Sequence, residues 1–338
     1  MTEAQRIVLA KRPVGAPADS DFRLESFDPG APGDGEILLQ TLWLSLDPYM
    51  RGRISDAKSY AAKVEIGDAI VGATVSRVIA SNHPGFAAGD LVLGQSGWRT
   101  HEISAGAGLT KLDPGMERPS LALGVLGMPG FTAWRGLMSI GEPKAGETVC
   151  VAAATGPVGA TVAQIAKLKG CRVIAIAGGA DKVAYARDTL KADAALDHRA
   201  PDFAARLAEA APDGIDVYFE NVGGAVLEAV IPLMNTFGRM PVCGTIAWYN
   251  MTAPPPGPDK TPVLMRAILT KRLRAQGFII ADHWSEFPAF LAEMGPWLRA
   301  GKIIALEDVV EGLANAPRAF MGLLEGRNFG KLVVKVAD

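Results

Sequence analysis

Residues 151–170, VAAATGPVGATVAQIAKLKG, decide the fold of this 338-residue chain. The segment has no charged residue before Lys167, and its uncharged length approaches that of a helix that spans a bilayer. Gly156, Pro157 and Gly159 lie near its centre, however, and such residues interrupt a long helix. A short buried strand, a glycine turn and a buried helix therefore explain the segment better than a membrane span does.

The composition argues against several classes of function. The formal net charge is −2, with 49% hydrophobic and 21% charged residues, as in a globular protein with a large core. No cluster of lysine and arginine favours nucleic acid or an anionic membrane as a partner. Cys150, Cys171 and Cys243 are too far apart for a disulfide framework or a zinc motif, and residues 7–10 are too short an apolar run for a signal peptide. We therefore expect a cytoplasmic protein.

The order of the predicted elements indicates an α/β protein with two kinds of domain. Residues 1–122 contain short strands separated by Gly, Pro and Asp, which is typical of a small β-barrel domain. In residues 123–295, strands alternate with helices, and this pattern predicts a doubly wound, mostly parallel sheet. A last strand at residues 331–336 predicts that residues 296–338 return to the first domain.

A proline-rich segment at residues 248–262 interrupts this pattern. Five prolines between Pro254 and Pro262 exclude a helix and a central strand from that part of the chain. A surface linker fits this composition. A loop over a substrate cleft fits as well, because a predicted strand of the parallel sheet ends directly before it.

The turn in the opening segment has the spacing of a nucleotide-binding motif. From Ala153 to Gly159 the sequence reads A-x-x-G-x-x-G between a predicted strand and a predicted helix. The glycines would permit a tight turn, and N–H groups at the start of the helix would face a pyrophosphate. The predicted phosphate-binding residues are Thr155, Gly156, Pro157, Val158 and Gly159.

The end of the next predicted strand, at Ala177, distinguishes NADP from NAD. Enzymes that use NAD usually place Asp or Glu there to bind the ribose 2′-hydroxyl. Here Gly178 and Gly179 follow the strand and leave room, and Lys182 lies close enough in sequence to pair with a 2′-phosphate. The sequence therefore favours NADP(H), although Lys182 can equally be a solvated residue at the start of a helix.

Six motifs lie along the chain in an order typical of one family: WLSLDPYMRGR at 43–53, GMPGFTAWRGL at 127–137, AATGPVGATVAQIAKLKGC at 153–171, FENVGG at 219–224, GRMPVCGTIAWYN at 238–250 and GRNFGKLVVKV at 326–336. With these motifs the chain resembles the zinc-independent medium-chain dehydrogenases/reductases. The resemblance is greatest to the group of prostaglandin reductases, leukotriene hydroxydehydrogenases and curcumin-reductase-like enzymes.

The resemblance implies a GroES-like N-terminal barrel, a Rossmann domain and a cofactor cleft between them. It implies NADPH-dependent reduction of a carbon–carbon double bond conjugated to a carbonyl. It also implies a homodimer, in which the predicted strand at 273–280 would pair with a second copy, although this strand is apolar enough to be buried instead. No metal is expected, because no Cys precedes Cys150 and neither His83 nor His101 has a sulfur partner nearby in sequence.

A metal-free reaction needs hydrogen-bond donors for the enolate that forms when hydride reaches the β-carbon. Tyr249 follows the predicted strand at 238–246 and matches a family tyrosine that is thought to work with the nicotinamide ribose. Tyr49 and Tyr60 are further candidates for lining the substrate pocket, and packing is the alternative role for all three tyrosines. No His or acid is placed as a general acid, so water is the expected source of the second proton.

The resemblance also implies further contacts to the cofactor. His198 stands where relatives carry a tyrosine, which leaves its role open, although an imidazole can contact a 2′-phosphate. The other implied contacts are Asn221, Val222, Cys243, Gly244, Thr245, Tyr249 and Asn328.

Two alternative functions remain open from the sequence. A quinone reductase or a metal-free alcohol oxidoreductase would use the same cofactor groove. A non-catalytic NADPH-binding protein would use the cofactor for regulation.

Overall fold

The computed structural model describes residues 3–338, and the predicted α/β class is confirmed. The chain forms two compact units. The first contains the residues up to Gly124 together with Asn250–Thr252 and Glu307–Asp338, and the second contains Val125–Tyr249 and Ala253–Leu306. Among the described residues, no helix is long and apolar enough to cross a membrane.

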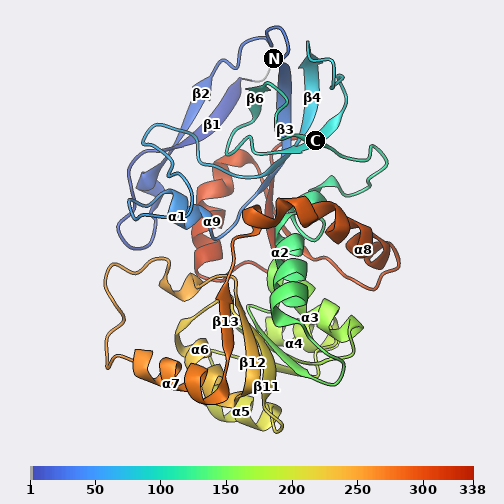
Figure 1. Ribbon diagram of the computed structural model, residues 1–338. Helices are drawn as coiled ribbons and strands as arrows, with labels where there is room; N and C mark the ends of the chain where they lie inside the picture. Colours follow the sequence, from blue (N-terminus) through green and yellow to red (C-terminus); the bar gives the residue numbers. More distant parts are fainter. Residues whose placement is uncertain (1–2) are drawn as a thin grey trace. The chain divides into compact units, whose positions relative to one another are not determined.

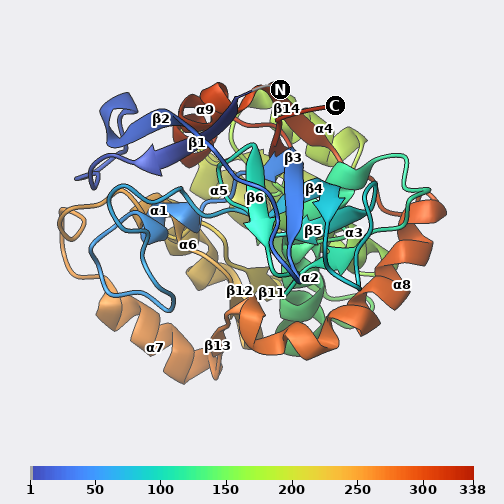
Figure 2. The same ribbon diagram turned by 90° about the horizontal axis from the view of Figure 1, so that it is seen from above.

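The first unit is built on a seven-stranded sheet of order β14-β15-β3-β4-β5-β7, with β6 paired to β3 (Figure 2). A separate hairpin pairs β1 with β2. The strands are β1 (Ala4–Leu9), β2 (Phe22–Phe27), β3 (Ile37–Ser45), β4 (Thr74–Ser81), β5 (Leu91–Gly94), β6 (His101–Ser104), β7 (Thr110–Lys111), β14 (Glu307–Glu311) and β15 (Lys331–Lys335).

The C-terminal strand β15 pairs antiparallel with β3, so the last residues of the chain complete a sheet that the first hundred residues begin. A buried ion pair accompanies this pairing, because Lys331 Nζ lies 2.8 Å from Asp47 Oδ1 and both side chains are almost fully buried. The helices of this unit, α1 (Met50–Arg53) and α9 (Ala316–Leu324), contribute Met50 and Phe320 to its core.

The second unit contains a six-stranded parallel sheet of order β10-β9-β8-β11-β12-β13 (Figure 1). The chain proceeds outward from β8 to β10 and then returns to the other side of β8, so the order reverses between β8 and β11. This doubly wound sheet is the one predicted from the sequence. Its strands are β8 (Thr148–Ala152), β9 (Arg172–Ala177), β10 (Ala194–Asp197), β11 (Ile215–Phe219), β12 (Met234–Val242) and β13 (Arg274–Gly277).

Helices cover both faces of this sheet, as the complete burial of every residue of β8 requires. One face packs Cys150, Ile174 and Tyr218 against side chains of α5, α6 and α7. The helices of the unit are α2 (Met128–Gly136), α3 (Pro157–Leu168), α4 (Ala180–Asp188), α5 (Phe203–Ala210), α6 (Gly224–Val230), α7 (Thr261–Lys271) and α8 (Phe287–Arg299).

The strand predicted at residues 238–246 begins and ends earlier in the structure. β12 runs over Met234–Val242 and passes through Phe237 at a positive φ of 64°. A break of this kind within a strand has no signal in the hydrophobic pattern. As a result, Cys243, Gly244 and Thr245 lie in the loop beyond the strand end.

The proline-rich segment contains no regular element from Tyr249 until α7 begins at Thr261. Pro262 occupies the first turn of α7, where its missing N–H has no cost. At the start of the segment, Arg51 donates from Nε to Asn250 Oδ1 at 3.0 Å and from Nη2 to the carbonyl of Gly15 at 2.7 Å. Asn250 is thus hydrogen-bonded to a buried arginine of the first unit.

Candidate functional site

The turn after β8 is shaped by close contacts within its own backbone. Ala153 has a positive φ of 51°, and its carbonyl accepts the N–H of Gly156 at 3.0 Å. α3 then begins at Pro157. A Cβ atom on Gly159 would lie only 2.3 Å from the carbonyl oxygen of Ala153. Glycine is therefore required at position 159 for strand and helix to approach this closely.

Gly156 differs from Gly159. A Cβ atom on Gly156 would meet only the carbonyl of Ala153, at 3.4 Å, and the φ of Gly156 is −75°. The fold therefore does not need glycine at position 156. An open backbone at the start of a twelve-residue helix fits a phosphate group, because the first N–H groups of a helix lack partners within it. These residues fit a dinucleotide, and the turn lies at the switch point of the sheet.

A second loop, after β11, meets this turn across the switch point. Asn221 donates from Nδ2 to the carbonyl of Ala152 at 2.8 Å, which joins the ends of β11 and β8. The N–H of Ala247 donates to the carbonyl of Val222 at 3.0 Å. The structure thus brings Asn221 and Val222 together with the loop after β12.

The loop after β12 carries Trp248 and Tyr249, which contact glycines. The indole of Trp248 lies 3.1 Å from the position that a Cβ on Gly223 would take, and Gly223 has a φ of 78°. The hydroxyl of Tyr249 lies 3.2 Å from the corresponding position on Gly244. The predicted residues Cys243, Gly244, Thr245 and Tyr249 therefore lie in one loop at the carboxyl end of β12.

The basic side chains of Lys182 and Arg199 and the imidazole of His198 gather where β9 and β10 end. His198 Nε2 and Arg199 Nε each lie 2.9 Å from the position of a Cβ on Gly178. Desolvation, then the charge of Arg199 and the smaller effect of Lys182, lower the pKa of His198 despite the neighbouring Asp197. The sequence placed Lys182 and His198 here but missed Arg199.

Asp197 lies close to these basic side chains, and its carboxylate accepts hydrogen bonds from the backbone. Oδ1 accepts the N–H of Arg199 at 2.9 Å. Desolvation alone would raise the pKa of Asp197, but hydrogen bonds from the N–H groups of Arg199 and Gly179 hold it below its usual value. Asp197 thus stabilises the loop, and the side chains of His198 and Arg199 remain exposed on the surface of this loop.

A buried carboxyl lies beneath the second loop. Glu220 is 1% exposed, and Oε1 accepts the N–H groups of Val222 at 2.5 Å and Gly223 at 2.8 Å. Desolvation raises the pKa of Glu220 even though these N–H groups oppose the shift. Sequence reasoning missed this residue, although an acid at the end of an apolar strand, within FENVGG, was a signal.

The predicted residues of the first unit lie in two places. Tyr49 and Tyr60 lie on either side of Arg53, whose guanidinium carbon is 5.9 and 5.8 Å from their ring centroids. Desolvation raises the pKa of Tyr49, and Tyr60 is 61% exposed. Asn328 donates from Nδ2 to the carbonyl of Gly330 at 2.9 Å.

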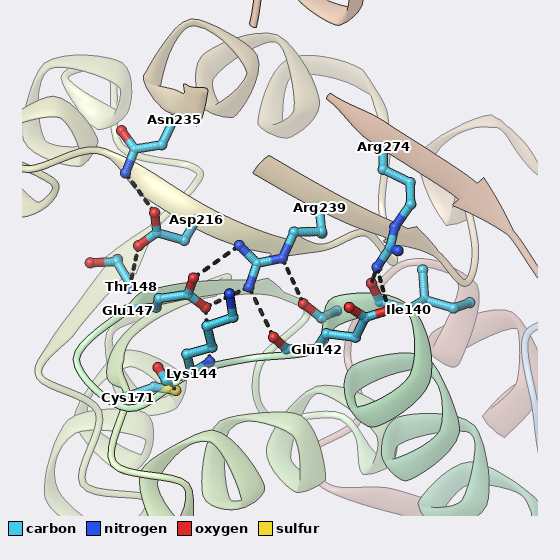
Figure 3. Close-up of polar contacts among 11 residues, drawn as sticks. Ile140, Glu142, Lys144, Glu147, Thr148, Cys171, Asp216, Asn235, Arg239 and Arg274 are labelled. Carbon is cyan, nitrogen blue, oxygen red and sulfur yellow. Dashed lines mark hydrogen bonds and ion pairs between the residues drawn. The ribbon is translucent and has the colours of Figure 1, made fainter. Parts of the chain in front are cut away.

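The opposite edge of the parallel sheet, where the strands begin, carries a different network (Figure 3). The guanidinium of Arg239 donates to Glu147 and to the carbonyls of Gly141 and Glu142. Asp216 accepts the N–H of Thr148 and the amide of Asn235, each at 2.8 Å. These groups bond to one another or to the backbone, so at this edge of the sheet they stabilise the fold.

Among residues 3–338, no three or more His, Cys, Asp and Glu side chains are grouped so that they could hold a metal ion. Cys150 and Cys171 are buried, Cys243 is half-buried, and all three are free thiols. Desolvation, followed by the charge of Glu220, raises the pKa of Cys243 to about 12.

A parallel sheet with a glycine turn at its switch point, joined to a β unit that contains both chain ends, defines a dinucleotide-dependent oxidoreductase of two units. Residues 5–112 match the family described as N-terminal domain of oxidoreductase, and residues 157–295 match the family described as zinc-binding dehydrogenase. The chain belongs to the medium-chain dehydrogenase/reductase family, which confirms the resemblance seen in its motifs.

Three relatives place the chain within that family. It is 58% identical to the NADPH-dependent curcumin reductase of Escherichia coli (strain K12), over 98% of this chain and 97% of the relative. It is 43% identical to prostaglandin reductase 1 of Rattus norvegicus, over 99% and 100% of the two chains. The crystal structure of CurA in complex with NADPH from Vibrio vulnificus matches with a TM-score of 0.96 and 54% identity, over 99% of both chains. The protein is thus an oxidoreductase of the group that contains these reductases.

Proposed function

We propose that this protein uses NADPH to reduce the carbon–carbon double bond of α,β-unsaturated ketones or aldehydes. The observation that carries the proposal is the half-buried Tyr249, whose hydroxyl is held over Gly244 in the loop at the carboxyl end of β12. The names of the relatives support this class of substrate, since curcumin is a conjugated enone.

NADPH is the cofactor, and it supplies a hydride when bound. The turn of residues 155–159 would hold its pyrophosphate. Lys182 and Arg199 would hold the 2′-phosphate by their charges and His198 by a hydrogen bond, because the three lie together at a strand end where the backbone occupies the carboxylate of Asp197. Asn221, Val222 and residues 243–245 would face the nicotinamide end, and Asn328 is a further proposed contact there.

In the proposed reaction, hydride addition to the β-carbon moves an electron pair onto the carbonyl oxygen of the substrate. The Tyr249 hydroxyl would donate a hydrogen bond to this enolate oxygen and lower the barrier. The α-carbon then takes a proton from water, since no acid of the site is assigned to deliver one. Tyr49 and Tyr60 would line the substrate pocket.

Replacement of Tyr249 tests this role. Tyr249→Phe should lower turnover roughly 10²–10³-fold, the usual effect of losing one oxyanion donor. The affinity for NADPH should stay the same, as measured by fluorescence titration. Tyr49→Phe and Tyr60→Phe serve as comparison variants, because a lining residue changes the KM of the substrate more than turnover. Unchanged turnover in Tyr249→Phe would remove the tyrosine from the mechanism.

Substrate choice separates the proposed activity from its alternatives. NADPH oxidation is followed with a 2-alkenal, a curcuminoid and a quinone, and the first two should be turned over faster. A preference for the quinone would favour a quinone reductase instead. Activity should persist after dialysis against a chelator, and a loss that zinc restores would contradict a metal-free reaction.

A second copy of the chain is the proposed partner. β13 is the outer strand of the parallel sheet, it pairs only with β12 among the described residues, and all of its residues are exposed. An exposed edge strand offers unpaired N–H and C=O groups to another strand. Sedimentation should show a homodimer, and a monomer at micromolar concentration would contradict the proposal.

A further inference from the structure

Glu220 organises the turn that follows β11. Its single oxygen Oε1 accepts two consecutive N–H groups, those of Val222 and Gly223. The second of these belongs to Gly223, whose φ of 78° is one that glycine adopts readily and other residues do not. The carboxyl therefore fixes the path of the backbone between Asn221 and the start of α6.

The backbone of Glu220 ties the same turn to the loop after β12. Its carbonyl accepts the N–H groups of Cys243 at 2.9 Å and Gly244 at 3.2 Å, and its own N–H donates to the carbonyl of Pro241 at 3.0 Å. One residue thus connects both loops at the carboxyl ends of β11 and β12. These are the loops that carry Asn221, Val222 and Tyr249.

The surroundings of the carboxyl are unusual for a residue that serves packing alone. Oε2 and the hydroxyl of Tyr218, two residues earlier, are both buried, and the two side chains interact with each other. None of the described residues forms an ion pair with Glu220. A buried carboxyl without a cation beside it is destabilising, so its presence calls for a compensating role.

The groups that face this carboxyl come from three strands. They are Tyr218 on β11, Cys150 on β8 and Cys243 beyond β12. Desolvation first, and the charge of Glu220 second, raise the pKa of each of the three above its ordinary value. These neighbours therefore stay neutral at acidic and neutral pH, and Glu220 is the group among them that titrates there.

We infer that Glu220 is a positioning residue. Its carboxylate holds the turn after β11, and its backbone joins that turn to the loop after β12, in the conformation that receives the nicotinamide end of the cofactor. The inference rests on the proposed cofactor site and adds a residue that does not itself touch the cofactor. The ionised carboxylate binds the two N–H groups more strongly than the protonated form does. Protonation should therefore loosen the nicotinamide end and leave the adenosine end unchanged.

The test compares two ligands that share one end. NADPH carries a nicotinamide, whereas 2′,5′-ADP carries only the adenosine with its 2′- and 5′-phosphates. In Glu220→Gln, which keeps one acceptor oxygen but no charge, the Kd for NADPH should rise about tenfold, as expected for losing a charge-assisted hydrogen bond. The Kd for 2′,5′-ADP should change less than about twofold.

The pH dependence gives a second readout. Both ligands have the same 2′-phosphate and face the same His198, so the ratio of their Kd values cancels these titrations. The 5′-phosphate of 2′,5′-ADP titrates in the wild type and in Glu220→Gln alike, so the comparison of the two proteins removes its effect. As pH falls through the raised pKa of Glu220, the Kd of NADPH relative to that of 2′,5′-ADP should rise more in the wild type than in Glu220→Gln.

Asp216→Asn is the matched control at the other end of β11. It also neutralises a carboxylate that accepts a backbone N–H, and it should lower stability without changing the ratio of Kd values. Equal weakening of both ligands in Glu220→Gln would overturn the inference, as would a ratio with the same pH dependence in the wild type and in Glu220→Gln. Neither measurement requires turnover, so failure of the enone assay would leave this test intact.

Discussion

At the amino end of β11, the carboxylate of Asp216 accepts hydrogen bonds from Thr148 and Asn235, and both of its oxygens are used within the fold. Just past the carboxyl end of the same strand, one oxygen of Glu220 accepts two backbone N–H groups, and the carboxyl also interacts with the hydroxyl of Tyr218. Both side chains are almost fully buried, and no cation pairs with Glu220 among the described residues.

The polar groups at the two edges of the parallel sheet therefore differ in their surroundings. Arg239, Glu147 and Asp216 bond to one another or to backbone at the amino edge, so their interactions end within the fold. At the carboxyl edge, the charges of Lys182 and Arg199 lie near His198 and a glycine loop. Parallel sheets of this kind bind ligands at their carboxyl edge, so we expect the cofactor there.

The largest effect is expected from Gly159→Ala. Its Cβ would lie 2.3 Å from the carbonyl of Ala153, and relief requires β8 and α3 to move apart. Unfolding by denaturant should show a loss of about 3 kcal/mol, at the upper end for overpacking, together with a loss of NADPH binding. Gly156→Ala is the control, because it should keep the stability and lose only affinity. Equal stability losses in the two variants would contradict this assignment.

Arg239→Ala should lower the stability of the fold and leave cofactor binding unchanged, which is the reverse of the effect expected for Gly156→Ala. Loss of its bonds to Glu147 and two carbonyls should lower the free energy of unfolding by about 2 kcal/mol. The KM for NADPH and turnover per folded molecule should be unchanged. A raised KM would show that the amino edge also serves the cofactor.

The same variant should change the response to acid. Burial alone would raise the pKa of Glu147, but Arg239 and the N–H of Lys144 hold it below its usual value. The stability from this pair is therefore present above the ordinary pKa of a glutamate and is lost as pH falls through the lowered one. Arg239→Ala should flatten that loss in denaturation curves measured against pH.

The smallest effect is expected from single losses of charge around Gly178. Lys182→Ala and Arg199→Ala should each raise the KM for NADPH about tenfold, the effect of one charge-assisted contact. The KM for NADH should barely change, because NADH lacks the 2′-phosphate. Lys191→Ala, on an exposed residue beyond α4, is the control. Equal changes for both cofactors would remove the phosphate role.

The sequence predicted what depends on local spacing. Ala153, Gly156 and Gly159 predicted the turn because their separation is itself the signal, and strand–helix alternation predicted the parallel sheet. The roles proposed for the site residues remain predictions. Tyr249 was reached through the resemblance, since no local pattern marks a tyrosine as a hydrogen-bond donor to substrate.

The residues that were missed depend on pairing between distant strands. Arg199 reaches Gly178 because β10 pairs in parallel with β9, with Asp197 opposite Ala177. The role inferred for Glu220 depends on the burial of its side chain and on the hydrogen bonds that its backbone carbonyl accepts from the N–H groups of residues 243 and 244. No hydrophobic pattern specifies such a register.

The position of β15 within the first sheet has a consequence for how the protein is made. β15 lies between β14 and β3, so the sheet of the first unit cannot close until β15 has emerged from the ribosome. Until then Asp47 lacks Lys331, its buried partner. The second unit, by contrast, is complete once Leu306 has emerged. Since chains fold progressively during synthesis, the nascent protein would carry a finished nucleotide-binding unit behind an open β-sheet, which needs protection from aggregation.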